Sequence, residues 1–324
     1  MSDSYTSKIP ACLLTCVTLL TTLAACGGSS GGSAATPPPP PVNTAVLPIT
    51  GDNAQDVTEA VFDAVTASAD LIDIGDVVGL PVIGSDSSGA TKPAFRDVLI
   101  QVTACDTGEL TTTWSDADDN LQVSTGDTFE TQFEMCFLQD PGVTFDGIST
   151  IDNLVVTGDP VNQIVPWGLA ATFAYVDLTA SDADDTVIIN GDLDLDLSSD
   201  DNIVLNGTVG TELLAVEVNG ANESLSDYLM TQVSDQNALT TVLGADGVYT
   251  SDTLDGSVTF ETLEDFVVMG DDNPSAGQLL ISDTSSSVLV TVLDNLNVQL
   301  DVDLDLDGTI DETITVTWAE LDIG

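Results

Sequence analysis

The sequence has no histidine and only three lysine or arginine residues among its 324 residues. Without an imidazole, the chain cannot form a Ser-His-Asp triad, a histidine general base or a zinc site with histidine ligands. A Ser-Lys nucleophile would need Lys92, and no motif marks a serine partner for it. These absences favour a non-catalytic protein over an enzyme.

Acidic side chains dominate instead, with 54 aspartates and glutamates and a formal net charge of −51. Such a surface repels nucleic acids and anionic lipid head groups, so we expect no nucleic-acid partner. Salt adaptation and divalent-cation binding both explain the charge, and we favour salt adaptation for most of it. Hydrophobic residues make up 43% of the chain and recur with a period of two, which argues against disorder over residues 45–324.

The N-terminal segment has the pattern of an export signal. Lys8 supplies a positive charge, and the apolar run over residues 11–20 has signal-peptide length and is too short to span a bilayer. Leu23-Ala24-Ala25-Cys26 closes this segment, and a Gly-, Ser- and Pro-rich run follows. Such a run is typical of a flexible tether with a stiff proline spacer.

This arrangement resembles the lipobox of bacterial lipoproteins. The resemblance implies that Cys26 carries acyl chains such as palmitate, and Gly27 after it implies sorting to the outer membrane of a diderm bacterium. We therefore expect a lipid-anchored protein that faces either the periplasm or the cell surface. The expected organisation is a signal peptide over 1–25, the lipidated Cys and tether over 26–44, and a single β-rich domain over 45–324.

The cysteine count favours one disulfide. Of five cysteines, Cys12 and Cys16 leave with the signal peptide and Cys26 is acylated, so Cys105 and Cys136 remain. Exported proteins occupy oxidising compartments, which predicts a bond between this pair. Closing a loop of about 30 residues stabilises the fold by roughly 3–4 kcal/mol on a chain-entropy estimate. A metal or redox pair is disfavoured because histidine and a Cys-x-x-Cys motif are both lacking.

One helix is expected over about 53–68, where apolar residues recur at helical spacing behind an Asp52/Gln55 capping box. From Phe95 onward, short alternating segments indicate β-strands, as in Val298–Leu306, where apolar residues alternate with polar and acidic ones. The chain is therefore predicted to be mainly β. An antiparallel meander would form a curved sheet or half-barrel, a closed barrel or a sandwich, with the helix packed on it.

Asx-Gly pairs are typical of hairpin turns, and seven of them separate the expected strands. They are Asp146-Gly147, Asn190-Gly191, Asn206-Gly207, Asn219-Gly220, Asp246-Gly247, Asp255-Gly256 and Asp307-Gly308.

The whole chain resembles acidic, β-rich lipoproteins of unknown function from marine Gram-negative bacteria. Besides the lipobox, the resemblance lies in Cys105-x-x-Gly108 with Phe133-x-x-Cys136, and in the C-terminal segment from Asp303 to Leu321. It implies location and architecture and supplies no activity.

One motif has the pattern of a metal site. Asp303, Asp305, Asp307 and Asp311 surround Gly308, and alternate carboxylates before a glycine turn are oxygen ligands suited to Ca²⁺. The motif departs from an EF-hand because the closing glutamate is replaced by isoleucine and the flanks are strands. An acidic strand face with a glycine turn is the alternative.

A second acidic run, Asp116, Asp118 and Asp119, is interpreted as a solvated loop.

Three functions are weighed. The first is a non-catalytic outer-membrane scaffold or binding module, whose partner is an envelope protein. The second is a carrier of a lipid or another hydrophobic small molecule on the concave face of a half-barrel. The third is a hydrolase that uses two carboxylates. For Trp114, Trp167 and Trp318 we favour packing in the core over a sugar-stacking platform. The packing of the inward face discriminates between them.

Overall fold

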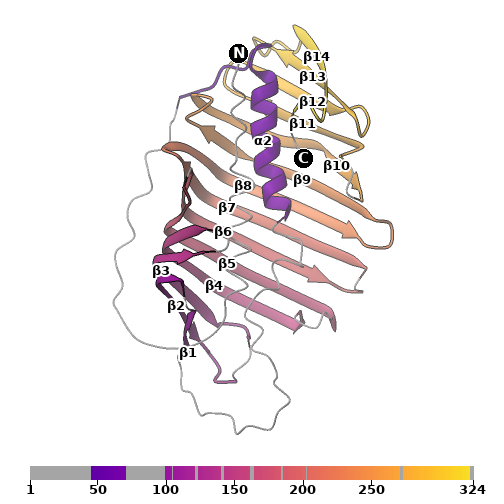
Figure 1. The fold of residues 1–324 in the computed structure, drawn as a ribbon. Helices are drawn as coiled ribbons and strands as arrows, with labels where there is room; N and C mark the ends of the chain where they lie inside the picture. The colour runs from indigo at the N-terminus through magenta and orange to yellow at the C-terminus, as the bar shows by residue number, and fades with distance from the viewer. Residues whose placement is uncertain are drawn as a thin grey trace.

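A computed structural model describes residues 45–70 and 99–321, with short gaps at 104, 121–122, 140–141, 161–163, 184, 202 and 271–272. The predicted signal peptide, Cys26 and the tether lie outside the described residues. In the described part, one helix, α2 (Ala54–Asp70), lies against one face of a single long sheet (Figure 1).

The sheet has 14 strands, and their order in the sheet is their order in the chain. Every neighbouring pair is antiparallel, so each connection is a hairpin. The strands are β1 (Leu99–Thr103), β2 (Thr107–Ser115), β3 (Thr128–Leu138), β4 (Val143–Asp159), β5 (Ile164–Ser181), β6 (Thr186–Ser199), β7 (Val204–Val218), β8 (Ala221–Asp235), β9 (Thr240–Ser251), β10 (Gly256–Met269), β11 (Ala276–Ser282), β12 (Ser287–Val292), β13 (Asn297–Asp303) and β14 (Glu312–Thr317).

The expected meander is confirmed, and the sheet stays open. Strands β1 and β14 are its two edges, and they do not pair with each other in the described chain. Of the architectures that the sequence left open, the open sheet with a helix on one face is the one present (Figure 1).

Alternation along the strands separates a buried face from a solvated one. In β13, Val298, Leu300 and Val302 are 0% exposed, whereas Gln299 and Asp301 between them are partly exposed on the opposite face. The same period of two recurs in the neighbouring strands, because side chains alternate sides along an extended backbone. The result is one apolar cluster that runs from β2 to β14.

Helix α2 covers part of this face through its apolar stripe. Its valines at 57, 61 and 65 are buried, and the ring of Phe62 meets Phe266 of β10 and Trp318 edge-to-face at centroid distances of 5.1 and 5.3 Å. The helix begins one residue later than expected and extends to Asp70. The expected capping box is not what holds its start. Gln55 instead donates from Nε2 to the backbone oxygen of Glu320 at 2.6 Å, which ties the first turn to the chain after β14.

Four of the seven Asx-Gly pairs are not turns, so this part of the prediction is wrong. The pairs that end at Gly220 and Gly308 lie in connections between strands, and Asp255-Gly256 joins the β9–β10 turn to the first residue of β10. The other four lie inside β4, β6, β7 and β9. Two of these show why a glycine is needed within a strand. Gly147 and Gly191 have φ of +106° and +119°, and a Cβ there would lie 2.2 and 2.1 Å from a carbonyl oxygen of the next strand. Both are next to register shifts, where a bulge brings the backbones together.

Strand β7 continues through residue 210 without interruption. Most of the segment from Ser224 to Asn237 belongs to β8.

Candidate metal centres

The loop between β13 and β14 brings three carboxylates together. Asp303 ends β13 and is 6% exposed, whereas Asp305 and Asp311 lie in the exposed loop. One oxygen from each of the three lies within 4.8 Å of the others, a spacing that suits a single cation.

Backbone amides fix this loop. Gly308 N donates to Asp303 Oδ2 at 2.9 Å and Asp305 N to Asp303 Oδ1 at 3.2 Å, while Leu304 N donates to Asp311 Oδ2 at 2.8 Å. Desolvation raises the pKa of Asp303, but the N–H donors, with Gly308 first among them, outweigh it and hold the pKa below its ordinary value. Asp303 is therefore anionic at neutral pH, as a metal ligand must be.

Asp307, the fourth expected ligand, does not join the group. Its Oδ1 accepts the backbone N–H of Thr309 at 2.7 Å, and its own N–H lies 3.3 Å from Asp305 Oδ1. The following Gly308 has φ of +82°, a conformation that favours glycine, and it turns the chain back toward β14. The loop thus presents three of the four predicted carboxylates to one point.

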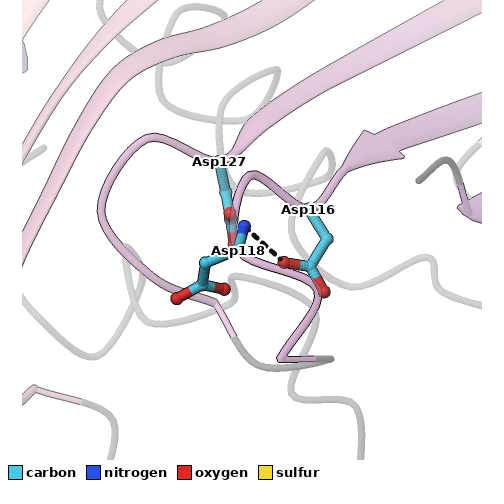
Figure 2. Close-up of side chains that lie close together, drawn as sticks. All are labelled: Asp116, Asp118 and Asp127. Atoms are coloured by element: carbon cyan, nitrogen blue, oxygen red, sulfur yellow. Dashed lines mark hydrogen bonds between the residues drawn. The ribbon is translucent and has the colours of Figure 1, made fainter. Parts of the chain in front are cut away.

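A second acidic group lies in the loop between β2 and β3. Asp116 and Asp118 meet Asp127, and one oxygen from each lies within 4.8 Å of the others (Figure 2). The sequence predicted a solvated loop here and grouped the first two with Asp119. Asp127 was missed because it is nine positions beyond Asp118, where no spacing rule connects them, and only the closing of the loop makes them neighbours.

Asp127 already has a structural role. It is fully buried and accepts hydrogen bonds from Ala117 N at 2.9 Å, Ser124 N at 2.9 Å and Trp114 Nε1 at 3.3 Å. These donors occupy both carboxylate oxygens, so the residue holds the loop ends together. The group is therefore the weaker of the two candidates for a cation.

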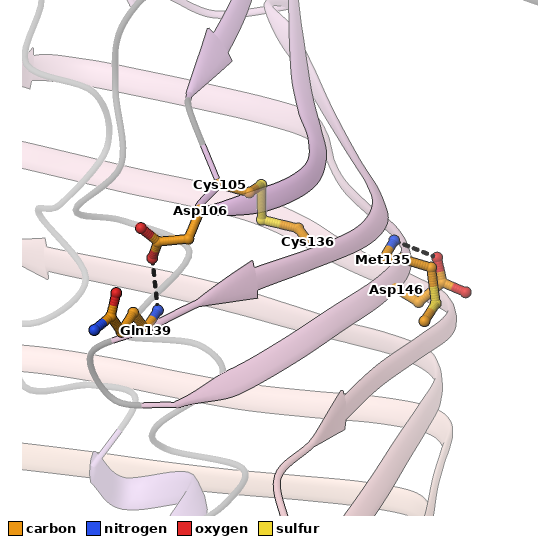
Figure 3. The surroundings of a disulfide bond; sticks show 6 residues. All are labelled: Cys105, Asp106, Met135, Cys136, Gln139 and Asp146. Carbon is orange, nitrogen blue, oxygen red and sulfur yellow. Dashed lines mark hydrogen bonds between the residues drawn. A yellow bond between two sulfur atoms is a disulfide. The ribbon is translucent and has the colours of Figure 1, made fainter.

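The predicted disulfide is present. Cys105, between β1 and β2, is bonded to Cys136 of β3, with their Cα atoms 5.3 Å apart (Figure 3). Hydrogen bonds to nearby aspartates continue the cross-links: Gln139 N donates to Asp106 Oδ2 at 2.7 Å, and Met135 N to an oxygen of Asp146 at 3.2 Å (Figure 3). The bond links the segment between β1 and β2 to β3, next to β1, which is an edge strand of the described sheet.

The three tryptophans do not form an exposed platform. Trp114, Trp167 and Trp318 are 3%, 5% and 1% exposed and belong to the core. Within the described residues, no helix is both long enough and apolar enough to cross a membrane. No family model, curated protein or solved structure matches the chain.

Proposed function

We propose that this protein is a non-catalytic lipoprotein, anchored in the outer membrane through Cys26, whose sheet is an envelope scaffold or binding module that binds Ca²⁺ in the β13–β14 loop. The observation that carries the calcium proposal is the convergence of Asp303, Asp305 and Asp311. The anchor is supported by the lipobox-like Leu23-Ala24-Ala25-Cys26 and the tether behind it.

The order of the residues supports Ca²⁺. Counted from Asp303, the three convergent carboxylates hold positions 1, 3 and 9 of a calcium loop, and Gly308 holds position 6, where such loops have an invariant glycine. Three carboxylates this close repel one another, and a divalent cation relieves that repulsion. Ca²⁺ tolerates irregular oxygen geometry, whereas Mg²⁺ demands a near-ideal octahedron and gives up its waters reluctantly.

Thermal melts at fixed molar NaCl test the calcium site, because general screening is then saturated. Millimolar Ca²⁺ should raise the melting temperature of the wild type, and Mg²⁺ should raise it less. Asp305→Asn with Asp311→Asn should abolish the calcium-specific increase. Glu261→Gln with Glu264→Gln, which removes two exposed charges from β10, is the matched control and should keep it. An equal response of both double variants would refute the site.

The anchor has a separate test. Cys26→Ser should abolish acylation and release the protein from the membrane fraction, because acyl chains supply roughly 0.8 kcal/mol for each buried CH₂. A Cys26→Ser protein that remains membrane-bound and acylated would contradict the proposal.

The carrier and hydrolase functions have no specific observation in their favour. The inward side chains that would line an open carrier face are buried, with Ile281, Val290 and Leu300 0% exposed.

A further inference from the structure

The two ends of the strands form two different rims of the sheet. One rim carries the turns between β4 and β5, β6 and β7, β8 and β9, β10 and β11, and β12 and β13, which are five consecutive turns along it. At each of them a large apolar side chain, in the turn or at the adjoining end of a strand, is exposed to solvent, with exposed fractions of 37–67%. We call this set the apolar rim: Ile164, Ile203, Leu239, Met269, Leu293 and Leu296.

The opposite rim differs over the same strands. Among its described residues, the turns from β3–β4 to β11–β12 expose no large apolar side chain. On this rim the exposed large apolar side chains are Val46, which bridges to the start of β10, and Leu304, Leu306 and Ile310 of the β13–β14 loop, with exposed fractions of 43–47%. Exposed apolar side chains at five successive turns are therefore a feature of the apolar rim and not of the hairpin turns of this sheet in general.

Aspartates fix the backbone of three of these apolar turns. Asp201 Oδ1 accepts the N–H groups of residues 203 and 204, both at 2.9 Å. Asp294 Oδ1 accepts those of residues 296 and 297 at 2.9 and 2.8 Å, and Asp235 Oδ1 those of residues 237 and 238 at 2.8 and 2.9 Å. Each of these side-chain oxygens ties two backbone N–H groups at or beside the exposed Ile203, Leu239 and Leu296.

The spacing of the apolar rim is regular. Successive turns on one rim are two strands apart, about 9.6 Å, and the five turns extend over about 38 Å along the sheet. Single aliphatic side chains at such intervals, with polar residues between them, can each insert separately into the apolar part of a lipid layer. A lipid layer is fluid, so no partner with matching pockets is needed. Their joint contact adds up because burial of apolar area is roughly additive.

The length and exit point of the tether allow this contact. The described chain begins at Ala45, and Val46 bridges to Ser257 at the start of β10, which is the opposite rim. The 18 residues between Cys26 and Ala45 reach at most about 60 Å when extended. Strand β10 has 14 residues and is about 46 Å long, so an anchored chain can place the apolar rim at the membrane surface.

Charge decides which lipid surface fits. Asp201, Asp235 and Asp294 stand beside the apolar side chains, and the chain carries a net charge of −51. Anionic head groups would be repelled, whereas zwitterionic head groups would not.

We propose that the apolar rim contacts a zwitterionic lipid surface. Its turns insert into the head-group region of the membrane that holds the anchor. This inference rests on the proposed anchoring through Cys26. Tethering keeps the rim at high effective concentration near the bilayer, so several weak contacts are sufficient.

Two labels at the ends of β9 test the orientation in the lipidated, processed protein, reconstituted in phosphatidylcholine vesicles that contain nitroxide-labelled acyl chains. Ala238→Cys places a fluorophore on the apolar rim, and Thr253→Cys places it in the exposed β9–β10 turn of the opposite rim. Strand β9 has 12 residues, so the labels lie about 40 Å apart. The label at 238 should be quenched at least about twofold more strongly than the label at 253, because nitroxide quenching acts only over short distances relative to that separation.

Two matched triple variants then test the side chains in the Ala238→Cys background. Leu239→Ser, Met269→Ser and Leu296→Ser should reduce the quenching to the level of the 253 label. Leu304→Ser, Leu306→Ser and Ile310→Ser on the opposite rim should leave it unchanged. Equal effects of both triples would overturn the inference. If the first triple variant does not fold, the comparison of the two labels decides the question by itself.

The failures are distinguishable. A protein that is not acylated and does not stay with the vesicles refutes the anchoring, and this inference with it. An anchored protein whose 238 label is quenched no more than its 253 label refutes only the lipid contact of the apolar rim, including the case in which the rim binds another protein.

Discussion

The most direct test of the fold is the substitution Phe62→Ala in helix α2. Phe62 is 3% exposed, and its ring lies between Phe266 of β10 and Trp318 after β14. If the helix is part of the core, as this packing requires, the loss of that ring should lower the free energy of unfolding of the whole sheet. If the helix only rests on the sheet, the loss should be small.

The structure sets the magnitude. Removing a buried phenylalanine ring costs about 3–5 kcal/mol, since transfer energy is lost and a cavity remains. Each edge-to-face contact contributes about 0.5–1.5 kcal/mol beyond the buried area, and Phe62 makes two, at interplanar angles of 75°. We therefore expect the free energy of unfolding to fall by about 4 kcal/mol.

Urea unfolding followed by tryptophan fluorescence measures this loss, and Trp318 reports on the contact itself. The midpoint should fall while the slope with urea stays the same. Asp56→Ala, at an exposed position in the first turn of the same helix, is the control and should cost at most about 1 kcal/mol. A loss for Phe62→Ala no larger than that of the control would refute the packing of α2 into the core.

Three further predictions follow from buried groups and the disulfide. Burial raises the pKa of Glu223 despite its 2.6 Å hydrogen bond from Tyr249 Oη, so its folded pKa lies above the unfolded value. The free energy of unfolding of the wild type should therefore fall relative to that of Glu223→Gln as pH rises from about 4.5 through the folded pKa. If the urea midpoints of the two proteins change in parallel across this range, the reasoning is wrong. The buried hydroxyl of Tyr228 has only the side chain of Ser68 beside it and forms no well-aligned hydrogen bond in the described chain, so Tyr228→Phe should change the melting temperature little. Tyr249→Phe, by contrast, should lower it because Glu223 loses its donor, and similar melts for both variants would refute this reasoning. Cys105→Ser with Cys136→Ser should lower the free energy of unfolding by roughly 3–4 kcal/mol, measured against the oxidised wild type; an unchanged midpoint would show that the disulfide adds no stability.

Much of the architecture could be predicted from the sequence. Alternation with a period of two assigns each strand its buried face, and short polar connections between such strands favour antiparallel neighbours. These local rules were sufficient for the meander, for the helix to within two residues, and for the disulfide, which the cysteine count left with one pairing.

The turns were harder because an Asx-Gly pair has two uses. Gly220 lies in a hairpin turn, whereas Gly147 and Gly191 lie at bulges where the next strand comes too close for a Cβ. The difference depends on a backbone that is 20 to 30 residues away in the sequence, so no local pattern reports it.

Two turns of the apolar rim share a short sequence pattern, but only the strand topology shows that they lie on the same rim. Asp201-Asn202-Ile203 and Asp294-Asn295-Leu296 share the order Asp-Asn-aliphatic, yet they are more than 90 positions apart. They lie on the same rim of the sheet because an even number of antiparallel strands separates them.

The acidic loops show the same division between sequence and tertiary structure. The sequence by itself determined that Asp303, Asp305, Asp307 and Asp311 crowd around a glycine, and that the chain carries a large excess of negative charge. Only the folded loop decided that three of them converge while Asp307 binds the N–H of Thr309, and that Asp127 joins Asp116 and Asp118. Side-chain direction depends on backbone angles and hydrogen-bond donors that the closing hairpin supplies, and residue order alone does not fix either.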